Sequence, residues 1–207
     1  MLLADIGNTH CHIFDMNQVE HLTHQEALSK YGNAALWYIS VRDGFEAQVA
    51  HYPQWRNISN DIFLQGAYDT MGVDRKALCL SADEGIFVDA GSAITVDVVE
   101  GGIYQGGFIY PGVRAMLDAY ASISDQLHTS LNEVVDLAQL PRTTKDGISY
   151  GIIAPIKALI QKHSKGKPLY FTGGDGKFLA HFFQDAIYDD TLVFRGMQRV
   201  IKGSKIC

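Results

Sequence analysis

The feature that most constrains the fold is a short pattern that occurs twice in the chain. Residues 2–9 (LLADIGNT) and residues 86–93 (IFVDAGSA) each form an apolar run that ends in Asp-x-Gly and a polar residue. Such a run predicts a buried strand, and the glycine predicts a tight turn whose bare backbone can approach a ligand. Each turn has a carboxylate beside a series of N–H groups that can bind phosphate. Two such turns favour two half-domains that bind one phosphate chain together.

Composition and charge limit the class of protein. A chain of 207 residues that is 47% hydrophobic can bury a sizeable core, and a formal net charge of −6 argues against nucleic acid or an anionic membrane as the main partner. We expect no membrane span and no signal peptide, because the apolar runs are short and no basic segment precedes one. Cys11, Cys79 and Cys207 are widely separated, which fits reduced thiols in a cytoplasmic protein.

The hydrophobic pattern predicts a similar order of strands and helices in the two halves. In the first half we expect strands at 2–5, 11–14, 19–22, 35–41 and 61–65, and helices at 25–31 and 44–52. In the second half we expect strands at 85–89, 94–99, 102–110, 167–172 and 192–194, and helices at 113–123, 145–163 and 177–183, with a short helix last. The sequence thus predicts an α/β fold of two half-domains with mixed sheets, residues 1–83 and 84–207.

Five short motifs follow one another along the chain. They are residues 5–9 (DIGNT), 72–75 (GVDR), 89–97 (DAGSAITVD), 106–112 (GGFIYPG) and 172–174 (TGG). In this order they resemble the motifs of type III pantothenate kinases, which belong to the superfamily of acetate kinase, sugar kinases, Hsp70 and actin. The resemblance implies two duplicated ribonuclease H-like (actin-like ATPase) half-domains with a nucleotide cleft between them. It also implies ATP-dependent phosphorylation of pantothenate to 4'-phosphopantothenate, the first step of coenzyme A biosynthesis.

The first turn has the groups that a nucleoside triphosphate needs. Phosphoryl transfer requires a triphosphate that is held still and neutralised. Gly7, Asn8 and Thr9 can donate hydrogen bonds to phosphate oxygens, and Asp5 is placed to hold Mg²⁺ through water, because Mg²⁺ keeps much of its hydration. The same ATP-binding segment is expected to include Ile6, His10, Cys11 and His12. An ordinary Asp-Gly turn after a buried strand is the alternative, and the second copy of the pattern favours phosphate.

Histidines beside this turn raise the question of a metal site. His10 and His12 would share one face of a strand, but no third ligand stands at a useful spacing. Contact with the nucleotide is therefore the favoured interpretation.

The second turn repeats the arrangement around Asp89. The resemblance implies a monovalent cation, K⁺ or NH₄⁺, at Asp89 and nucleotide contacts at Gly91 and Ser92, where the family usually has threonine in place of the serine. A turn that Asp89 merely caps is the alternative. Gly173 and Gly174 follow a predicted strand and resemble the turn on which adenosine rests, since two glycines let a backbone pass close to a flat ligand.

Residues 72–75 are expected to carry substrate binding and catalysis. The resemblance implies that Gly72, Val73, Asp74 and Arg75 bind pantothenate and that Asp74 is the general base. An aspartate close to a primary alcohol can accept its proton as the O–P bond forms. The fork of Arg75 suits the pantothenate carboxylate, or it orders Asp74. The alternative is the start of a helix with Arg75 on a solvated face.

The resemblance also implies a substrate pocket at the interface of a homodimer. Tyr68 corresponds to a substrate-binding tyrosine, and Thr144 to a threonine that contacts pantothenate across that interface, with Thr143 as an alternative to Thr144. Two other functions stay open: another phosphotransferase of the same superfamily, and a nucleotide-binding regulatory factor without turnover. The presence of Asp5, Asp74 and Asp89 argues against the second of these.

Overall fold

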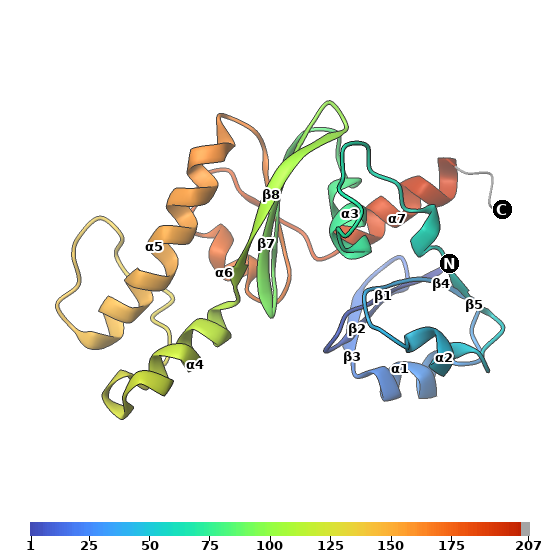
Figure 1. The fold of residues 1–207 in the computed structure, drawn as a ribbon, viewed down its shortest axis with the longest axis horizontal. Helices are drawn as coiled ribbons and strands as arrows, with labels where there is room; N and C mark the ends of the chain where they lie inside the picture. Colours follow the sequence, from blue (N-terminus) through green and yellow to red (C-terminus); the bar gives the residue numbers. More distant parts are fainter. Residues whose placement is uncertain (204–207) are drawn as a thin grey trace. The chain divides into compact units, whose positions relative to one another are not determined.

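The computed structural model describes residues 1–203, which form two compact units (Figure 1). Among the described residues, unit 1 contains 1–83, 99–105 and 190–203, and unit 2 contains 84–98 and 106–189. The end of unit 1's first segment at residue 83 coincides with the division expected from the repeat. Residues 99–105 and 190–203 depart from that division, because the C-terminal helix packs on a helix and a strand of unit 1. The two half-domains, residues 1–83 and 84–207, stay a prediction.

Unit 1 is built on a five-stranded mixed sheet. Its strands are β1 (Leu2–Ile6), β2 (Cys11–Phe14), β3 (Val19–Leu22), β4 (Leu36–Ser40) and β5 (Trp55–Asn57), in the order β3-β2-β1-β4-β5. β1 pairs antiparallel with β2 and parallel with β4, so the sheet is mixed at its centre. The remaining pairs are antiparallel for β2 with β3 and parallel for β4 with β5.

Helices lie on both faces of this sheet (Figure 1). They are α1 (His24–Tyr31), α2 (Phe45–Val49), α3 (Val73–Cys79) and α7 (Leu192–Gly203), with a 3-10 turn at Ser59–Asp61. Ala27 of α1 and Phe45 of α2 are buried in one core cluster with Leu36 and Tyr38 of β4. On the other face α3 packs against α7, where a β carbon on Gly196 would overlap the carbonyl of Ala77.

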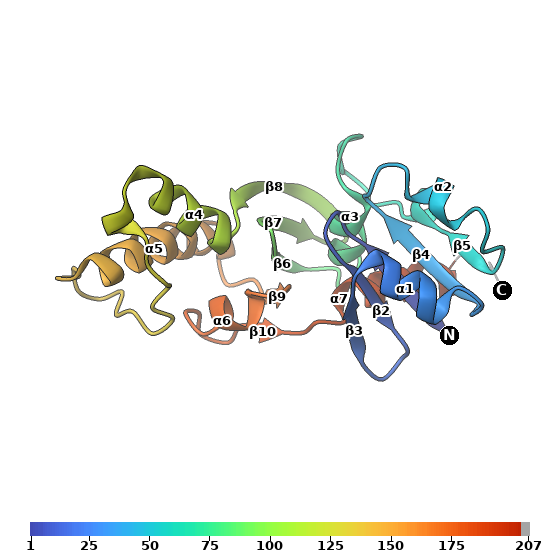
Figure 2. The same cartoon turned by 90° about the horizontal axis from the view of Figure 1, so that it is seen from below.

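Unit 2 repeats the strand order of unit 1 (Figure 2). Its strands are β6 (Gly85–Ala90), β7 (Ala93–Glu100), β8 (Ile103–Pro111), β9 (Leu169–Thr172) and β10 (Ile187–Tyr188), in the order β10-β9-β6-β7-β8. Read from β8, this order matches that of unit 1 strand for strand. β6 pairs parallel with β9, as β1 does with β4. The duplication that the two turns indicate therefore extends to the whole sheet.

The core of unit 2 is formed by the apolar faces of its helices and strands. Its helices are α4 (Val113–Ile123), α5 (Thr144–Ser164) and α6 (Gly176–Ala180), with a 3-10 turn at Asp125–Leu127. α5 presents buried isoleucines on one helix face, where each lies three or four residues from another: Ile148, Ile152, Ile153, Ile156 and Ile160. They pack against the central strand β6, whose Ile86 and Val88 are fully buried. No helix within residues 1–203 is long and apolar enough to cross a bilayer.

Two of the expected strands are wrong. Residues 61–65 form no strand, and the edge of the sheet is β5 instead. Ile62 and Leu64 are buried while Asp61, Phe63 and Gln65 are exposed, so an irregular segment reproduces the alternation of a strand. Residues 192–194 open α7, and the last strand is β10. A run of three buried residues is too short for its periodicity to distinguish a helix from a strand.

Candidate functional site

The first turn projects polar residues from the end of β1. The Gly7 N–H donates to the His10 carbonyl at 3.0 Å, which closes the turn, and Asn8, Thr9 and His10 are exposed. Ile6 and Cys11 flank the turn and are fully buried, so their side chains do not reach a ligand on the surface of the turn. The turn therefore presents the groups of Asn8 and Thr9 that the sequence assigns to phosphate.

Ionisable side chains lie behind this turn on β1 and β2. Asp5 is half-buried and stands opposite His12 in the strand register. Burial, and then the neighbouring His21 and His10, lower the pKa of His12 to about 4. The Nδ1 atoms of His12 and His21 are 2.7 Å apart, so one of the two rings donates to the other. Burial, and then the charge of Asp5, raises the pKa of Cys11 to about 12, so this thiol stays protonated.

The second turn, in unit 2, is supported by the start of α4. The Gly91 N–H donates to the Ala93 carbonyl at 3.0 Å, and the Gly112 N–H donates to the Ser92 carbonyl at 3.2 Å. A β carbon on Gly112 would overlap the carbonyls of Gly91 and Ser92. Only glycine fits at this position, which gives the last residue of the motif 106–112 a structural reason. Gly91 and Ser92 themselves are exposed.

The glycine pair after β9 lies directly against Asp89. Gly173 has a φ of +86°, and a β carbon there would overlap both the Asp89 carboxylate and the Ala90 carbonyl. Gly174 is exposed with no atom within 4 Å of its β position. The Asp175 N–H donates to the Ala90 carbonyl at 2.9 Å, so the segment closes over the end of β6. The structure thus brings together the residues predicted for the monovalent cation and for adenosine.

Asp175 is a residue that the sequence analysis did not assign to the site. Burial raises the pKa of its carboxyl, and the charge of Glu133 acts in the same direction. This raised pKa makes Asp175 a candidate member of the site, because acids with perturbed pKa values gather at functional sites. The sequence signal that could have found Asp175 is its position directly after Gly174.

Gly72 is the N-cap of α3, and Val73, Asp74 and Arg75 are its first three residues. The Asp74 Oδ1 accepts the Arg75 N–H at 2.7 Å, and a β carbon on Gly72 would overlap that oxygen. Arg75 is only 7% exposed, so the alternative of a solvated face is wrong for it. Its Nη1 donates to the Tyr68 hydroxyl at 2.7 Å, and Tyr68 is itself 45% exposed. The structure therefore joins Tyr68 to the Gly-x-Asp-Arg element.

The two threonines at the start of α5 differ in their roles. Thr143 is the N-cap: its Oγ1 accepts the Asp146 N–H at 3.1 Å and donates to Asp146 Oδ2 at 2.8 Å. Thr144 is exposed and takes no part in this cap. The geometry favours Thr144 for contact with a ligand.

Comparison with known proteins identifies the family of the chain. The sequence profile of the family "Type III pantothenate kinase" matches residues 39–165. A type III pantothenate kinase of Helicobacter hepaticus is 44% identical over 203 residues, which is 98% of each chain. One of Wolinella succinogenes is 41% identical over 206 residues, 99% of this chain and 98% of the other. The chain belongs to the type III pantothenate kinase family. The predicted function, phosphorylation of pantothenate in coenzyme A biosynthesis, is thereby confirmed.

Solved structures confirm the fold of this pantothenate kinase. A Campylobacter jejuni protein, assigned to the Baf family of transcriptional activators, aligns over 100% of both chains with a TM-score of 0.91 and 37% identity. A 2-dehydro-3-deoxygalactonokinase-like protein of Sinorhizobium meliloti aligns with a TM-score of 0.60 at 10% identity, over 98% of this chain and 96% of the other. The ADPNP-bound activator of 2-hydroxyisocaproyl-CoA dehydratase from Clostridium difficile has a TM-score of 0.56 at 11% identity, over 100% and 98%. These two distant likenesses concern the fold alone, and the expected actin-like ATPase fold is confirmed.

Two residues of the pantothenate kinase contact the first turn without having been predicted. Arg42 Nη1 donates to the Asn8 carbonyl at 3.2 Å, and His24 Nε2 lies 2.9 Å from the Gly7 carbonyl. Arg42 follows β4, and the carboxyl ends of the parallel neighbours β1 and β4 meet at one edge of the sheet. The sequence carried no signal for Arg42, because its place beside Asn8 depends on the pairing of β1 with β4.

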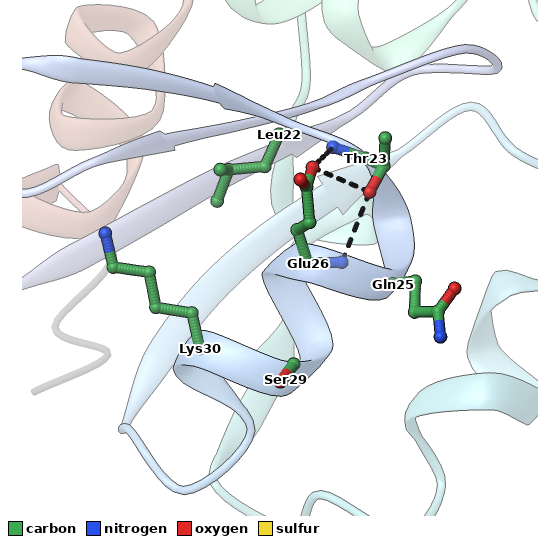
Figure 3. Close-up of a pocket in the computed structure, with 6 residues that line it drawn as sticks. All are labelled: Leu22, Thr23, Gln25, Glu26, Ser29 and Lys30. Atoms are coloured by element: carbon green, nitrogen blue, oxygen red, sulfur yellow. Dashed lines mark hydrogen bonds between the residues drawn. The ribbon is translucent and has the colours of Figure 1, made fainter.

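A hollow of about 610 Å³ lies on the outer side of α1 (Figure 3). It is lined by Leu22, Thr23, Gln25, Glu26, Ser29 and Lys30. Thr23 and Glu26 form a reciprocal capping box there: Glu26 Oε2 accepts the Thr23 N–H at 2.8 Å, and the Glu26 N–H donates to Thr23 Oγ1 at 3.3 Å. Two polar residues of this hollow, Thr23 and Glu26, therefore serve to begin α1 at His24.

Proposed function

We propose that Asp74 is the general base of this pantothenate kinase. As the primary hydroxyl oxygen of pantothenate bonds to the γ-phosphorus of ATP, Asp74 accepts the hydroxyl proton, and the bond from the γ-phosphorus to the bridging oxygen of ADP breaks. The observation that carries this role is the hydrogen bond from the Arg75 N–H to Asp74 Oδ1, which holds a half-buried carboxylate in one orientation at the start of α3.

Arg75 and Tyr68 are proposed to hold the carboxylate of pantothenate. A buried guanidinium offers a rigid fork that suits a carboxylate, and the Tyr68 hydroxyl at 2.7 Å orients it. Gly72 and Val73 shape the same segment, because the close approach of Asp74 excludes a side chain at Gly72. Thr144 is proposed as a further pantothenate contact, and the pocket is proposed to lie at the interface of a homodimer.

The two turns are proposed to bind the nucleotide. Gly7, Asn8 and Thr9 would donate hydrogen bonds to phosphate oxygens, with His10 and His12 beside them. In unit 2, Gly91 and Ser92 would contact the nucleotide, and Gly173 and Gly174 would carry adenosine. The support is geometric: the polar residues of both turns are exposed, and both turns are held from behind by buried strands.

Metal ions are proposed at the two aspartates. Asp5 is a half-buried carboxylate beside the phosphate turn, an oxygen donor of the kind that holds Mg²⁺ through water. Asp89 has its carboxylate and the Ala90 carbonyl on the same side, facing the β position of Gly173, and these oxygens suit K⁺ or NH₄⁺. When bound, Mg²⁺ would neutralise charge that develops on the phosphates.

One assay tests the activity and the cations together. We would measure ADP release by the purified chain with MgATP, with and without pantothenate, in K⁺ buffer and then in Na⁺ buffer. Pantothenate-dependent release that requires K⁺ or NH₄⁺ is the expected result. Release that ignores pantothenate would indicate another acceptor. Size-exclusion chromatography with light scattering on the same sample tests the homodimer.

A second candidate function is regulation without turnover. It is favoured by the Campylobacter jejuni structure, 37% identical to this chain, whose description names transcriptional activators. A folded chain that binds nucleotide but releases no ADP under any of these conditions would support this candidate over the first.

A further inference from the structure

Two side chains from different elements converge on the backbone of the first turn. Arg42 Nη1 donates to the Asn8 carbonyl at 3.2 Å and lies 2.9 Å from His24 Nδ1. His24 Nε2 lies 2.9 Å from the Gly7 carbonyl. A single tautomer satisfies all three contacts: neutral His24 accepts from Arg42 at Nδ1 and donates its Nε2–H to Gly7. Successive carbonyls of the turn are therefore held by one connected pair, which we call the His24–Arg42 clamp.

The clamp determines where the N–H groups of the turn point. In a trans peptide the C=O and the N–H of one plane point in opposite directions. The Gly7 carbonyl shares its plane with the Asn8 N–H, and the Asn8 carbonyl shares its plane with the Thr9 N–H. Because both carbonyls are tied to the clamp, both N–H groups face away from it. Neither N–H donates a hydrogen bond to any residue of the described chain.

Local structure fixes each member of the clamp. His24 is the first residue of α1, and the capping box of Thr23 and Glu26 sets where that helix begins (Figure 3). Arg42 follows β4, where the Val41 N–H donates to the Ile6 carbonyl at 3.1 Å and the Arg42 N–H donates to Ser40 Oγ at 3.1 Å. Arg42 is thus attached to the same strand end as the turn that the clamp holds, and His24 is fixed by the start of α1.

We infer that His24 and Arg42 are positioning residues that preset the first turn for the phosphates of ATP. This inference rests on the proposed role of that turn. Two N–H groups that already face away from the clamp need no reorganisation when an anion binds. The cationic guanidinium behind them adds a favourable field for a polyphosphate. Neither side chain has to touch the nucleotide for this effect.

Steady-state kinetics of three variants and one control test the clamp. His24→Ala and Arg42→Ala should each raise KM for MgATP about tenfold, the ratio that corresponds to about 1.4 kcal/mol, while KM for pantothenate stays within about twofold. His24→Gln, which can donate to Gly7 and accept from Arg42, should stay within about threefold of the wild type. The matched control is Arg56→Ala, because Arg56 is an exposed arginine of the same sheet that stacks on Trp37 at 4.9 Å. Its kinetics should not change.

The double variant and a ligand without phosphates separate positioning from folding. Because both residues hold one turn, His24→Ala with Arg42→Ala should raise KM for MgATP by clearly less than the product of the single effects. Binding of adenosine, followed by saturation-transfer NMR, should be the same in every variant. If the affinities for adenosine and MgATP fall together, or if the single variants keep the wild-type KM for MgATP, the inference is wrong. If the wild-type chain itself binds no MgATP, the proposed role of the first turn in phosphate binding is wrong. That result is distinguishable from a failure of the clamp, which would leave wild-type binding of MgATP intact.

Discussion

The carboxylate of Asp89 occupies the space that a β carbon on Gly173 would need. The two residues come from the ends of parallel neighbours, since Asp89 of β6 pairs with Thr172 of β9. In unit 1 the same relation brings Arg42, after β4, to Asn8, after β1. Each unit therefore builds its candidate ligand site at the carboxyl edge of a parallel strand pair, the usual place for a ligand in such sheets.

Replacing Gly173 by alanine should damage both stability and nucleotide binding. Alanine at a φ of +86° is strained, and its β carbon would overlap Asp89 and Ala90. We expect Gly173→Ala to lower the free energy of unfolding by about 2–3 kcal/mol in urea titrations. Gly174→Ala is the matched stability control, because no atom lies within 4 Å of its β position, and it should change stability by less than about 1 kcal/mol. Equal stability of the two variants would contradict the close approach of Gly173 to Asp89.

Asp74→Asn should remove turnover and leave the fold intact. The amide keeps an oxygen that can accept the Arg75 N–H, but it cannot take the proton of pantothenate. We expect kcat to fall at least about a hundredfold with unfolding free energy within about 0.5 kcal/mol of the wild type. Asp69→Asn, an exposed change in the loop before α3, is the control. Near-normal kcat for Asp74→Asn would rule out its role as the base.

Tyr68→Phe should weaken pantothenate binding selectively. The change removes the hydroxyl that accepts from the buried Arg75 at 2.7 Å, so the guanidinium loses its orientation. We expect KM for pantothenate to rise about fivefold, which corresponds to about 1 kcal/mol, with KM for MgATP unchanged. Tyr52→Phe, whose ring packs on Trp55, serves as the comparison in the same assay. Equal effects of Tyr68→Phe on both KM values would argue against a specific substrate role.

His12 should make unit 1 sensitive to mild acid. Burial lowers the pKa of His12 from its ordinary 6.5 to about 4, so the unfolded chain binds the proton first as the pH falls. The stability contributed by neutral His12 is complete above about pH 6.5 and is lost progressively between pH 6.5 and 4, by about 1–3 kcal/mol. His12→Gln should therefore show a smaller loss of melting temperature between pH 7 and 5 than the wild type. His51→Gln, an exposed change, should follow the wild-type curve, and parallel curves for all three proteins would refute the prediction.

The sequence by itself determined the repeat, most of the strands and helices, and the motifs that identify the family. These features are local: apolar periodicity and turn chemistry act over a few residues, so β1, β6 and α5 could be located within a residue or two. Local alternation also explains the failure at 61–65, where an irregular segment buries every second residue without a partner strand.

Only the tertiary structure decided which of these local pieces meet. The parallel pairing of β1 with β4 and of β6 with β9 places Arg42 on Asn8 and Gly173 on Asp89, and the packing of α3 buries Arg75 against Tyr68. The physical reason is that strand order and helix packing depend on burying apolar faces contributed by distant segments. No short stretch of sequence carries that information.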